Sequence, residues 1–257
     1  MMMLLGACDA GGSGTLEVVV YGEEYIEEQI PAETFADGWT VTFDRFLVVV
    51  GGVTVAEGDS PVLEAPRFTV FDLSEGTGGA GQRVARSMVA AGAADATAYV
   101  IAPAEDIAGD AADAKQMKDG GYSVYVEGKA SKGDVTKTFA WGWKTHTDYE
   151  GCMSTAQVED GGTASVQLAI HGDHLFYDDL FATEPAVRFD LIAQADDDGD
   201  GDGEISQAEL EAVDLRPLAN YQVGSTDITD LWRFIEHQTT TLGHIDGEGH
   251  CEATRVG

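Results

Sequence analysis

The sequence predicts a mainly β protein, an antiparallel β-sandwich or barrel with a C-terminal helical segment that contains one EF-hand-like loop. Three observations support this prediction. The chain has 257 residues, 44% of them hydrophobic, which is enough to bury a substantial core. β-Branched and aromatic runs recur at short spacing over residues 15–170. Beyond Pro185 the pattern changes to helical periodicity beside an acidic loop.

The strands are predicted from runs rich in β-branched and aromatic residues, which clusters of Gly, Asp and Pro separate. These runs are 15–22, 39–50, 53–56, 67–73, 96–102, 122–128, 135–143 and 163–170. Gly51 and Gly52 predict a turn between the second and third runs, and the segment 129–134 predicts a hairpin loop. The close spacing of the runs favours antiparallel pairing.

Helices are predicted mainly in the last third of the chain. Residues 206–214 and 226–241 have helical patterns, and in the second of these the apolar residues recur at helical spacing on one stripe that would pack on the sheet. Earlier in the chain, residues 81–92 predict one crossover helix. Residues 104–119 predict a loop with a single helical turn.

The charge balance excludes one class of partner. The chain has 46 acidic and 14 basic residues, so its formal net charge is -32. Nucleic acid phosphates and anionic lipid headgroups would repel such a chain, so nucleic acid is not expected as a partner. Two explanations of the acid excess stay open: adaptation to high salt, or a surface that concentrates cations.

The N-terminal run Leu5-Gly6-Ala7-Cys8 resembles a bacterial lipobox, in which an aliphatic residue and two small residues precede the cysteine that receives lipid. The resemblance implies a lipoprotein of the bacterial cell envelope, on the periplasmic or outer surface, that contacts the membrane through its lipid anchor only. A free cysteine is the alternative. The predicted organisation is therefore a lipobox and flexible tether (1–14), an antiparallel β domain (15–185), and a segment of calcium loop, helices and tail packed on it (186–257).

Two further cysteines, Cys152 and Cys251, are predicted to form a disulfide. Export into an oxidising compartment favours their pairing, which would pin the C-terminus to the middle of the chain. Closing a loop of this length would stabilise the fold by about 2 to 4 kcal/mol. Two buried thiols are the alternative.

Residues 198–209, DGDGDGEISQAE, match the twelve-residue EF-hand pattern, with Gly203 at the sharp turn and Ile205 at the apolar position. The expected Ca²⁺ ligands are Asp198, Asp200, Asp202, the carbonyl of Glu204, Ser206 directly or through water, and both carboxylate oxygens of Glu209. The sequence contains no second loop of this kind. The segment before the loop also lacks the aromatic residues that usually end the entering helix of an EF-hand. The motif is therefore similar to the isolated calcium loops of bacterial extracellular proteins, which implies structural Ca²⁺. An acidic surface tract is the alternative.

Four histidines are candidate ligands of zinc or copper: His171, His174, His244 and His250. The first two follow a predicted strand, and the last two lie in a Gly-rich loop just before Cys251. The remaining two, His146 and His237, are expected to serve only their local surroundings. The alternative for the four candidate histidines is that each one contacts only its own turn or strand end and binds no metal.

Three functions follow from these features. The first is a non-catalytic, lipid-anchored metal-binding protein. The second is a zinc-dependent hydrolase with Asp173 or Glu248 as base. The third is an adhesion or interaction module that a calcium loop stiffens. The sequence has no GxSxG, Walker or dinucleotide-binding motif, so no catalytic residue is assigned and the non-enzymatic reading is favoured.

Overall fold

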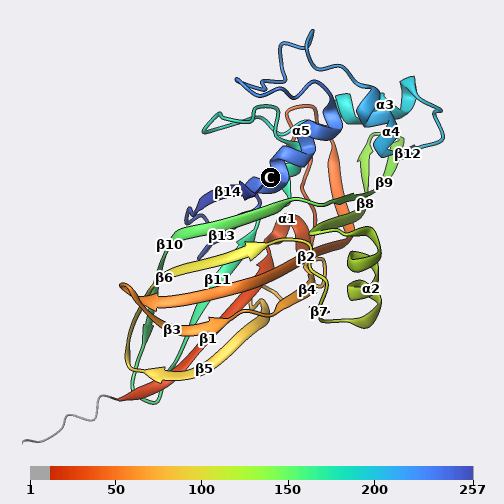
Figure 1. Cartoon of the computed structure of the whole chain (residues 1–257). Helices are drawn as coiled ribbons and strands as arrows, with labels where there is room; N and C mark the ends of the chain where they lie inside the picture. Colours follow the sequence, from red (N-terminus) through yellow and green to blue (C-terminus); the bar gives the residue numbers. More distant parts are fainter. Residues whose placement is uncertain (1–11, 257) are drawn as a thin grey trace, which may run out of the picture.

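The computed structural model describes residues 12–256, so the predicted lipidation site Cys8 lies outside the described residues. Within this range the chain is mainly β, as the sequence predicts, and its strands form two sheets (Figure 1). The described part contains no helix that is both long and apolar enough to cross a membrane.

The smaller sheet has four strands in the order β13-β11-β1-β5. Their bounds are Gly243–Ile245, Thr163–Ile170, Ser13–Gly22 and Gln82–Ala90. The β1 and β11 strands run parallel, and the outer two run antiparallel to their neighbours. The interior sides of β1 and β11 are lined by alternating branched residues with no exposed surface, because side chains alternate between the two faces of a strand.

The larger sheet has the order β12-β9-β8-β2-β6-β10-β14, with β3, β4 and β7 attached beside β2. The bounds along the main path are Glu204–Ile205, Val135–Trp143, Val124–Lys132, Thr40–Glu57, Gly92–Ile101, His146–Val158 and Glu252–Val256. Those of β3, β4 and β7 are Ser60–Ala65, Phe68–Asp72 and Ile107–Ala108. Most neighbours are antiparallel, but β12 with β9 and β4 with β7 are parallel.

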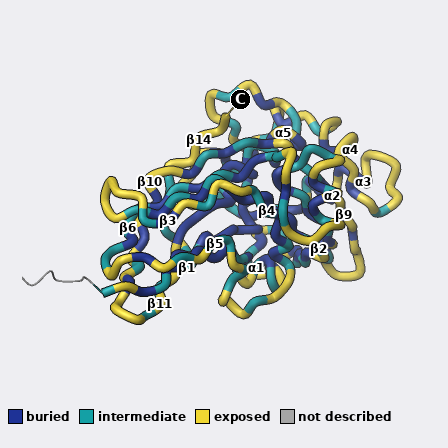
Figure 2. Tube along the Cα trace, turned by 60° about the horizontal axis from the view of Figure 1, so that its bottom comes forward, coloured by how far each residue is buried: buried dark blue, intermediate teal, exposed yellow. Residues whose placement is uncertain are grey.

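The core lies between the two sheets, which remain separate rather than closing into a barrel. One cluster of buried side chains includes Val18 of β1, Leu168 of β11, Val50 of β2 and Tyr99 of β6. Figure 2 shows the buried strand segments inside and the exposed connections outside. A second cluster, with Met117, forms where a helix covers the other face of the larger sheet. Each apolar face is thus covered by another layer, so the two sheets form a sandwich and not a barrel. Both sheets are mixed, because they contain parallel pairs that the prediction of antiparallel pairing did not include.

Two local predictions were wrong. The segment predicted as a helix over residues 81–92 instead contains the edge strand β5 (Gln82–Ala90), because pairing with β1 supplies the backbone partners that the sequence pattern does not reveal. Gly51 and Gly52 do not form a turn. They lie inside the single strand β2, where the pairing with β6 shifts register, and Gly52 has a φ of 60° that a side chain would strain.

Short helices accompany the sheets. They are α1 (Glu24–Glu27), α2 (Ala111–Gly120), α3 (Asp190–Asp198), α4 (Gln207–Ala212) and α5 (Leu231–Gln238), with 3₁₀ turns at Asp173–Phe176 and Thr239–Thr241. The α4 and α5 helices agree with the sequence prediction. Residues 104–119 contain more helix than the single predicted turn, because Asp110 caps the start of α2 and Gly121 ends it with a left-handed conformation.

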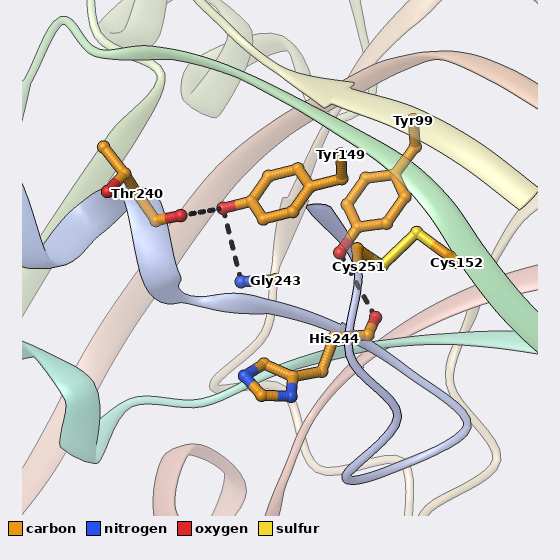
Figure 3. The surroundings of a disulfide bond; sticks show 7 residues. All are labelled: Tyr99, Tyr149, Cys152, Thr240, Gly243, His244 and Cys251. Atoms are coloured by element: carbon orange, nitrogen blue, oxygen red, sulfur yellow. Dashed lines mark hydrogen bonds between the residues drawn. A yellow bond between two sulfur atoms is a disulfide. The ribbon is translucent and has the colours of Figure 1, made fainter. Parts of the chain in front are cut away.

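The C-terminal segment is part of both sheets. Its strand β13 extends the smaller sheet, β14 pairs with β10 of the larger one, and the short loop between them crosses the edge of the sandwich. The structure joins Cys152 of β10 to Cys251 at the end of this loop, a sequence separation of 99 residues. The disulfide therefore fixes the end of this loop to β10, close to Tyr99, Tyr149 and His244 (Figure 3).

Candidate metal centre

The centre forms where neighbouring strands end at the same edge of the smaller sheet. Because β1 and β11 are parallel, with Gly22 opposite Ile170, their carboxyl ends meet, and the next residues are Glu23 and His171. The antiparallel strand β13 then places His244 opposite Ala169, one residue from that edge. Parallel pairing thus brings together residues that are remote in the sequence.

The four candidate histidines lie in one cluster. The ring centroid of His171 lies 5.1 Å from that of His174 and 4.2 Å from that of His244. His174 and His244 are 5.2 Å apart, and His250 lies 5.3 Å from His244. The first three are buried and His250 is exposed. The group from the middle of the chain and the group from its tail therefore form one site.

The backbone fixes the proton on His174. Its Nδ1 lies 2.8 Å from the carbonyl oxygen of Thr241, which can only accept a hydrogen bond, so Nδ1 donates and Nε2 presents its lone pair. This arrangement is typical of histidines that bind metals. Burial, together with His171 and His244, lowers the pKa of His174 to about 3. Burial and the neighbouring His171 and His250 lower the pKa of His244 to about 4. Both rings are therefore neutral near pH 7, the form that coordinates a metal.

Three carboxylates surround the rings. Glu23 Oε2 lies 3.5 Å from His171 Nδ1. Glu248 groups with His171 and His244, and Asp173 with His171 and His174, with ligand atoms within 4.8 Å of one another in each group. Burial raises the pKa of the Asp173 carboxyl despite the opposing effect of His171, and burial likewise raises that of Glu23. Nitrogen and oxygen donors of this kind suit Zn²⁺ or Cu²⁺.

Two tyrosines of the larger sheet support the site. Tyr99 Oη donates to the carbonyl oxygen of His244 over 3.2 Å, and Tyr149 Oη donates to that of Thr240 over 3.2 Å (Figure 3). Their rings stack at 4.6 Å. A Cβ on Gly243 would lie 2.3 Å from Tyr99 Oη, so only glycine permits this close approach. The His244 ring projects away from the tyrosines (Figure 3).

A cavity of about 380 Å³ opens beside the rings. Its lining includes His174, His244, His250 and Glu248, together with the apolar Leu180 and Pro185. A small ligand or water molecules could therefore reach a metal held by these residues.

Two helices flank the predicted calcium loop. The α3 helix ends at Asp198, the first loop position, and α4 begins at Gln207, the tenth. Ile205 is buried and pairs with β9 of the sandwich, and its carbonyl accepts from Trp141 Nε1 over 2.8 Å. The larger sheet thus holds the end of the loop in place.

The loop carboxylates are arranged differently from the predicted ligand set. Those whose ligand atoms lie within 4.8 Å of one another are Asp196, Asp200 and Glu209, of which Asp196 precedes the predicted loop. Asp198 instead accepts from Gln194, and Asp202 accepts from the Glu204 amide over 2.8 Å. The Ser206 side chain and Glu209 form a reciprocal capping box at the start of α4.

A buried lysine faces this loop. Lys137 of β9 forms ion pairs with Asp196, which has no exposed surface, and with Asp197 at 2.5 Å. The side-chain hydrogen bond from Lys137 lowers the pKa of Asp196. Lys137 therefore compensates part of the negative charge that accumulates here.

The remaining histidines lie elsewhere. His146 Nε2 lies 3.0 Å from Asp148 Oδ1, and His237 is half-buried on α5. Asp246, two residues after His244, accepts from Ser154, Thr155 and Gln167, which fixes the loop that carries Glu248.

Sequence reasoning missed three residues of these sites, namely Glu23, Asp196 and Lys137. A signal existed for Glu23, which directly follows a buried strand, as His171 does. Predicting that Glu23 lies beside His171 requires the order of the strands in the sheet, and the sequence alone does not provide that order. Asp196 and Lys137 gave no signal, because an aspartate in an acidic tract and a lysine in a strand are both common.

No protein-family model matches the chain, and no curated protein matches its sequence. A search of solved structures finds a protein from Bacteroides eggerthii described as a "putative cell adhesion protein". The two chains are 9% identical, and the likeness covers 63% of this chain and 46% of the other, so this chain spans about half the length of that protein. The TM-score is 0.16, too low to establish a shared fold or to inform function.

Proposed function

We propose that this chain is a metal-binding protein of the bacterial cell envelope, with zinc or copper in the histidine cluster and structural Ca²⁺ in the loop 198–209. A lipid on Cys8 would anchor it to the membrane. Its partners would be metal ions, and the activity would be binding rather than catalysis.

The observation that carries the proposal is the convergence of three buried imidazoles, those of His171, His174 and His244, with centroids 4.2–5.2 Å apart. Clustering neutral rings has no evident benefit for folding, since each buried ring nitrogen needs a partner. His244 Nδ1 has none among the described residues. A metal would satisfy these lone pairs. The disulfide between Cys152 and Cys251 supports the proposed location, because such bonds persist in oxidising compartments.

Elemental analysis of the purified chain, without an affinity tag that contains histidine, tests the proposal. After dialysis against trace zinc or copper, we expect transition metal in addition to calcium. The double variant His171→Ala/His174→Ala should lose the transition metal and keep the calcium, and the matched double variant His146→Ala/His237→Ala should keep both. Calcium alone in the wild-type protein would reject the proposal and leave the adhesion module.

The zinc-dependent hydrolase remains the second candidate, and the cavity beside the rings is the observation that favours it. Glu248 is exposed and lines this cavity, where a carboxylate could accept a proton from metal-bound water. Asp173 fits that role less well, because it is largely buried and accepts from Tyr177 over 3.1 Å. Turnover of activated esters by the zinc-loaded protein, lost in Glu248→Gln, would favour the hydrolase.

A further inference from the structure

His171 is shared by two different groups of ligands. The first consists of His171, His244 and Glu248, and the second of His171, Asp173 and His174. Apart from His171, the two groups have no member in common. A single tetrahedral ion would not use five such side chains, so the cluster has more ligands than one ion requires.

The two ring nitrogens of His171 face different neighbours. Nδ1 lies 3.5 Å from Glu23 Oε2, and Nε2 lies 3.4 Å from the carbonyl oxygen of Gly247, the residue before Glu248. Both contacts are long for hydrogen bonds, so either nitrogen can exchange its weak protein contact for a bond to a metal ion. The Nε2 side of the ring therefore faces the loop that carries Glu248, and the Nδ1 side faces Glu23.

Each group also contains a buried polar atom without a hydrogen-bond partner among the described residues. In the first group it is His244 Nδ1, and in the second it is Asp173 Oδ1, whose companion oxygen accepts from Tyr177. Buried polar atoms are rarely left without a partner, and a bound metal ion would supply one to each of these two atoms. The two atoms belong to different groups, so each group has one buried atom that a metal ion of its own would satisfy.

We propose that the cluster binds two divalent transition-metal ions, bridged by the His171 imidazole. This inference rests on the proposed function and specifies its stoichiometry. One ion binds Nε2 of His171 with His244 and Glu248, and the other binds Nδ1 with Asp173 and His174. His250 and Glu23 are placed to add a ligand to the first and second ion, respectively. The metals change no oxidation state on binding.

The charges support two ions. Forming the bridge releases the remaining N–H proton of His171 to solvent, and each ion accepts one lone pair of the resulting imidazolate. The carboxylates of Glu23, Asp173 and Glu248 carry three negative charges when ionised, one more than a single divalent ion neutralises. With two ions, these charges and that of the imidazolate are balanced.

Copper provides a test, because an imidazolate bridge couples the spins of two Cu²⁺ ions. The calcium-saturated full chain, without a histidine tag, is titrated with Cu²⁺, and both bound copper and the integrated electron paramagnetic resonance signal are measured. We expect two coppers at the cluster, with a signal that rises during the first equivalent and falls during the second. Adding Zn²⁺ to the form with one copper should preserve the signal of an isolated Cu²⁺.

Single variants separate the two positions. Asp173→Asn and Glu248→Gln should each reduce the bound copper from two ions to one and restore an uncoupled signal. His146→Gln is the matched control and should keep two coupled ions. Glu248 is exposed, so its variant remains informative even if the buried Asp173→Asn fails to fold, which circular dichroism would reveal.

The outcomes distinguish this inference from the proposed function. One copper with full spin in the wild-type chain would reject the bridge and leave the metal-binding function intact. Two coppers with undiminished spin would likewise overturn the bridge in favour of independent sites. Absence of copper and zinc from the cluster would reject both proposals.

Discussion

Tyr99 donates a hydrogen bond from its buried Oη to the backbone carbonyl of His244, so a strand of the larger sheet holds a residue of the histidine cluster in the smaller one. Cys152 and Cys251 form a second connection between the same regions. The position of the cluster therefore depends on how the two sheets are joined, and not only on the residues around the rings.

The variant Tyr99→Phe tests the first connection. It should lower the free energy of unfolding by about 1 kcal/mol or more, because the carbonyl of His244 loses a buried donor. Metal affinity should fall as well, since β13 is less firmly held. Urea unfolding of the metal-free protein measures the first effect, and a competition assay with a metal-binding dye measures the second. Tyr125→Phe, which removes a phenol remote from the cluster, should leave metal affinity unchanged.

The double variant Cys152→Ser/Cys251→Ser tests the second connection. Chain-entropy arguments give an upper value of about 4.7 kcal/mol for a closed loop of about 100 residues, and the usual contribution of a disulfide is about 2 to 4 kcal/mol. We expect a lower urea midpoint and weaker metal binding, because His250 directly precedes Cys251 and loses its constraint. Unchanged metal affinity in the variant would show that the pairing of β13 and β14 and the contacts of Asp246 hold the loop without the disulfide.

Acid should destabilise the metal-free protein through the buried imidazoles. The folded chain holds the pKa of His174 at about 3 and that of His244 at about 4, below the ordinary value of 6.5. As pH falls through 6.5, the unfolded chain therefore binds protons that the folded chain does not, and the free energy of unfolding decreases toward pH 4 and 3. Each unit of pKa difference contributes about 1.4 kcal/mol at most.

The carboxyls that face these rings oppose part of this effect. The pKa values of Glu23 and Asp173 are raised in the fold, so their protonation favours the folded chain at acidic pH. Urea midpoints measured with chelator between about pH 7.5 and about pH 4.5 give the net slope. In His174→Gln this slope should be smaller, and an identical slope would contradict the assignment of the effect to His174.

The sequence predicted which histidines form the site better than it predicted which strands bring them together. Because periodicity reports which face of a strand is buried, it located the strand end before His171, and the cysteine pair suggested that the tail meets the middle of the chain. The edge strand β5 was mistaken for a helix, since half-exposed strands lack a clear alternation. The parallel pairing of β1 with β11, which brings Glu23 to His171, depends on contacts between segments far apart in sequence, and one sequence does not report these.

Lys137 should couple calcium binding to stability. In the variant Lys137→Met, Asp196 remains fully buried without its ion pair, so unfolding without calcium should become easier by about 3 to 5 kcal/mol. Calcium should restore much of this loss, because the ion replaces the missing positive charge. Thermal unfolding with calcium and with chelator measures both effects. Lys132→Met removes an exposed ion pair with Asp190 and should cost about 1 kcal/mol or less in either condition.

Glu209→Gln separates calcium binding from helix capping. Glutamine can still accept from the Ser206 amide, as Glu209 does over 2.8 Å, so the capping box and the fold should be retained. The carboxylate charge at the twelfth loop position is lost, and with it bidentate binding of Ca²⁺. We expect calcium affinity to fall at least about tenfold by calorimetry, which corresponds to about 1.4 kcal/mol. The increase in melting temperature on adding calcium should shrink, while the metal-free melting temperature stays close to that of the wild type. A variant that binds calcium as tightly as the wild type would show that the loop does not coordinate the ion as an EF-hand does.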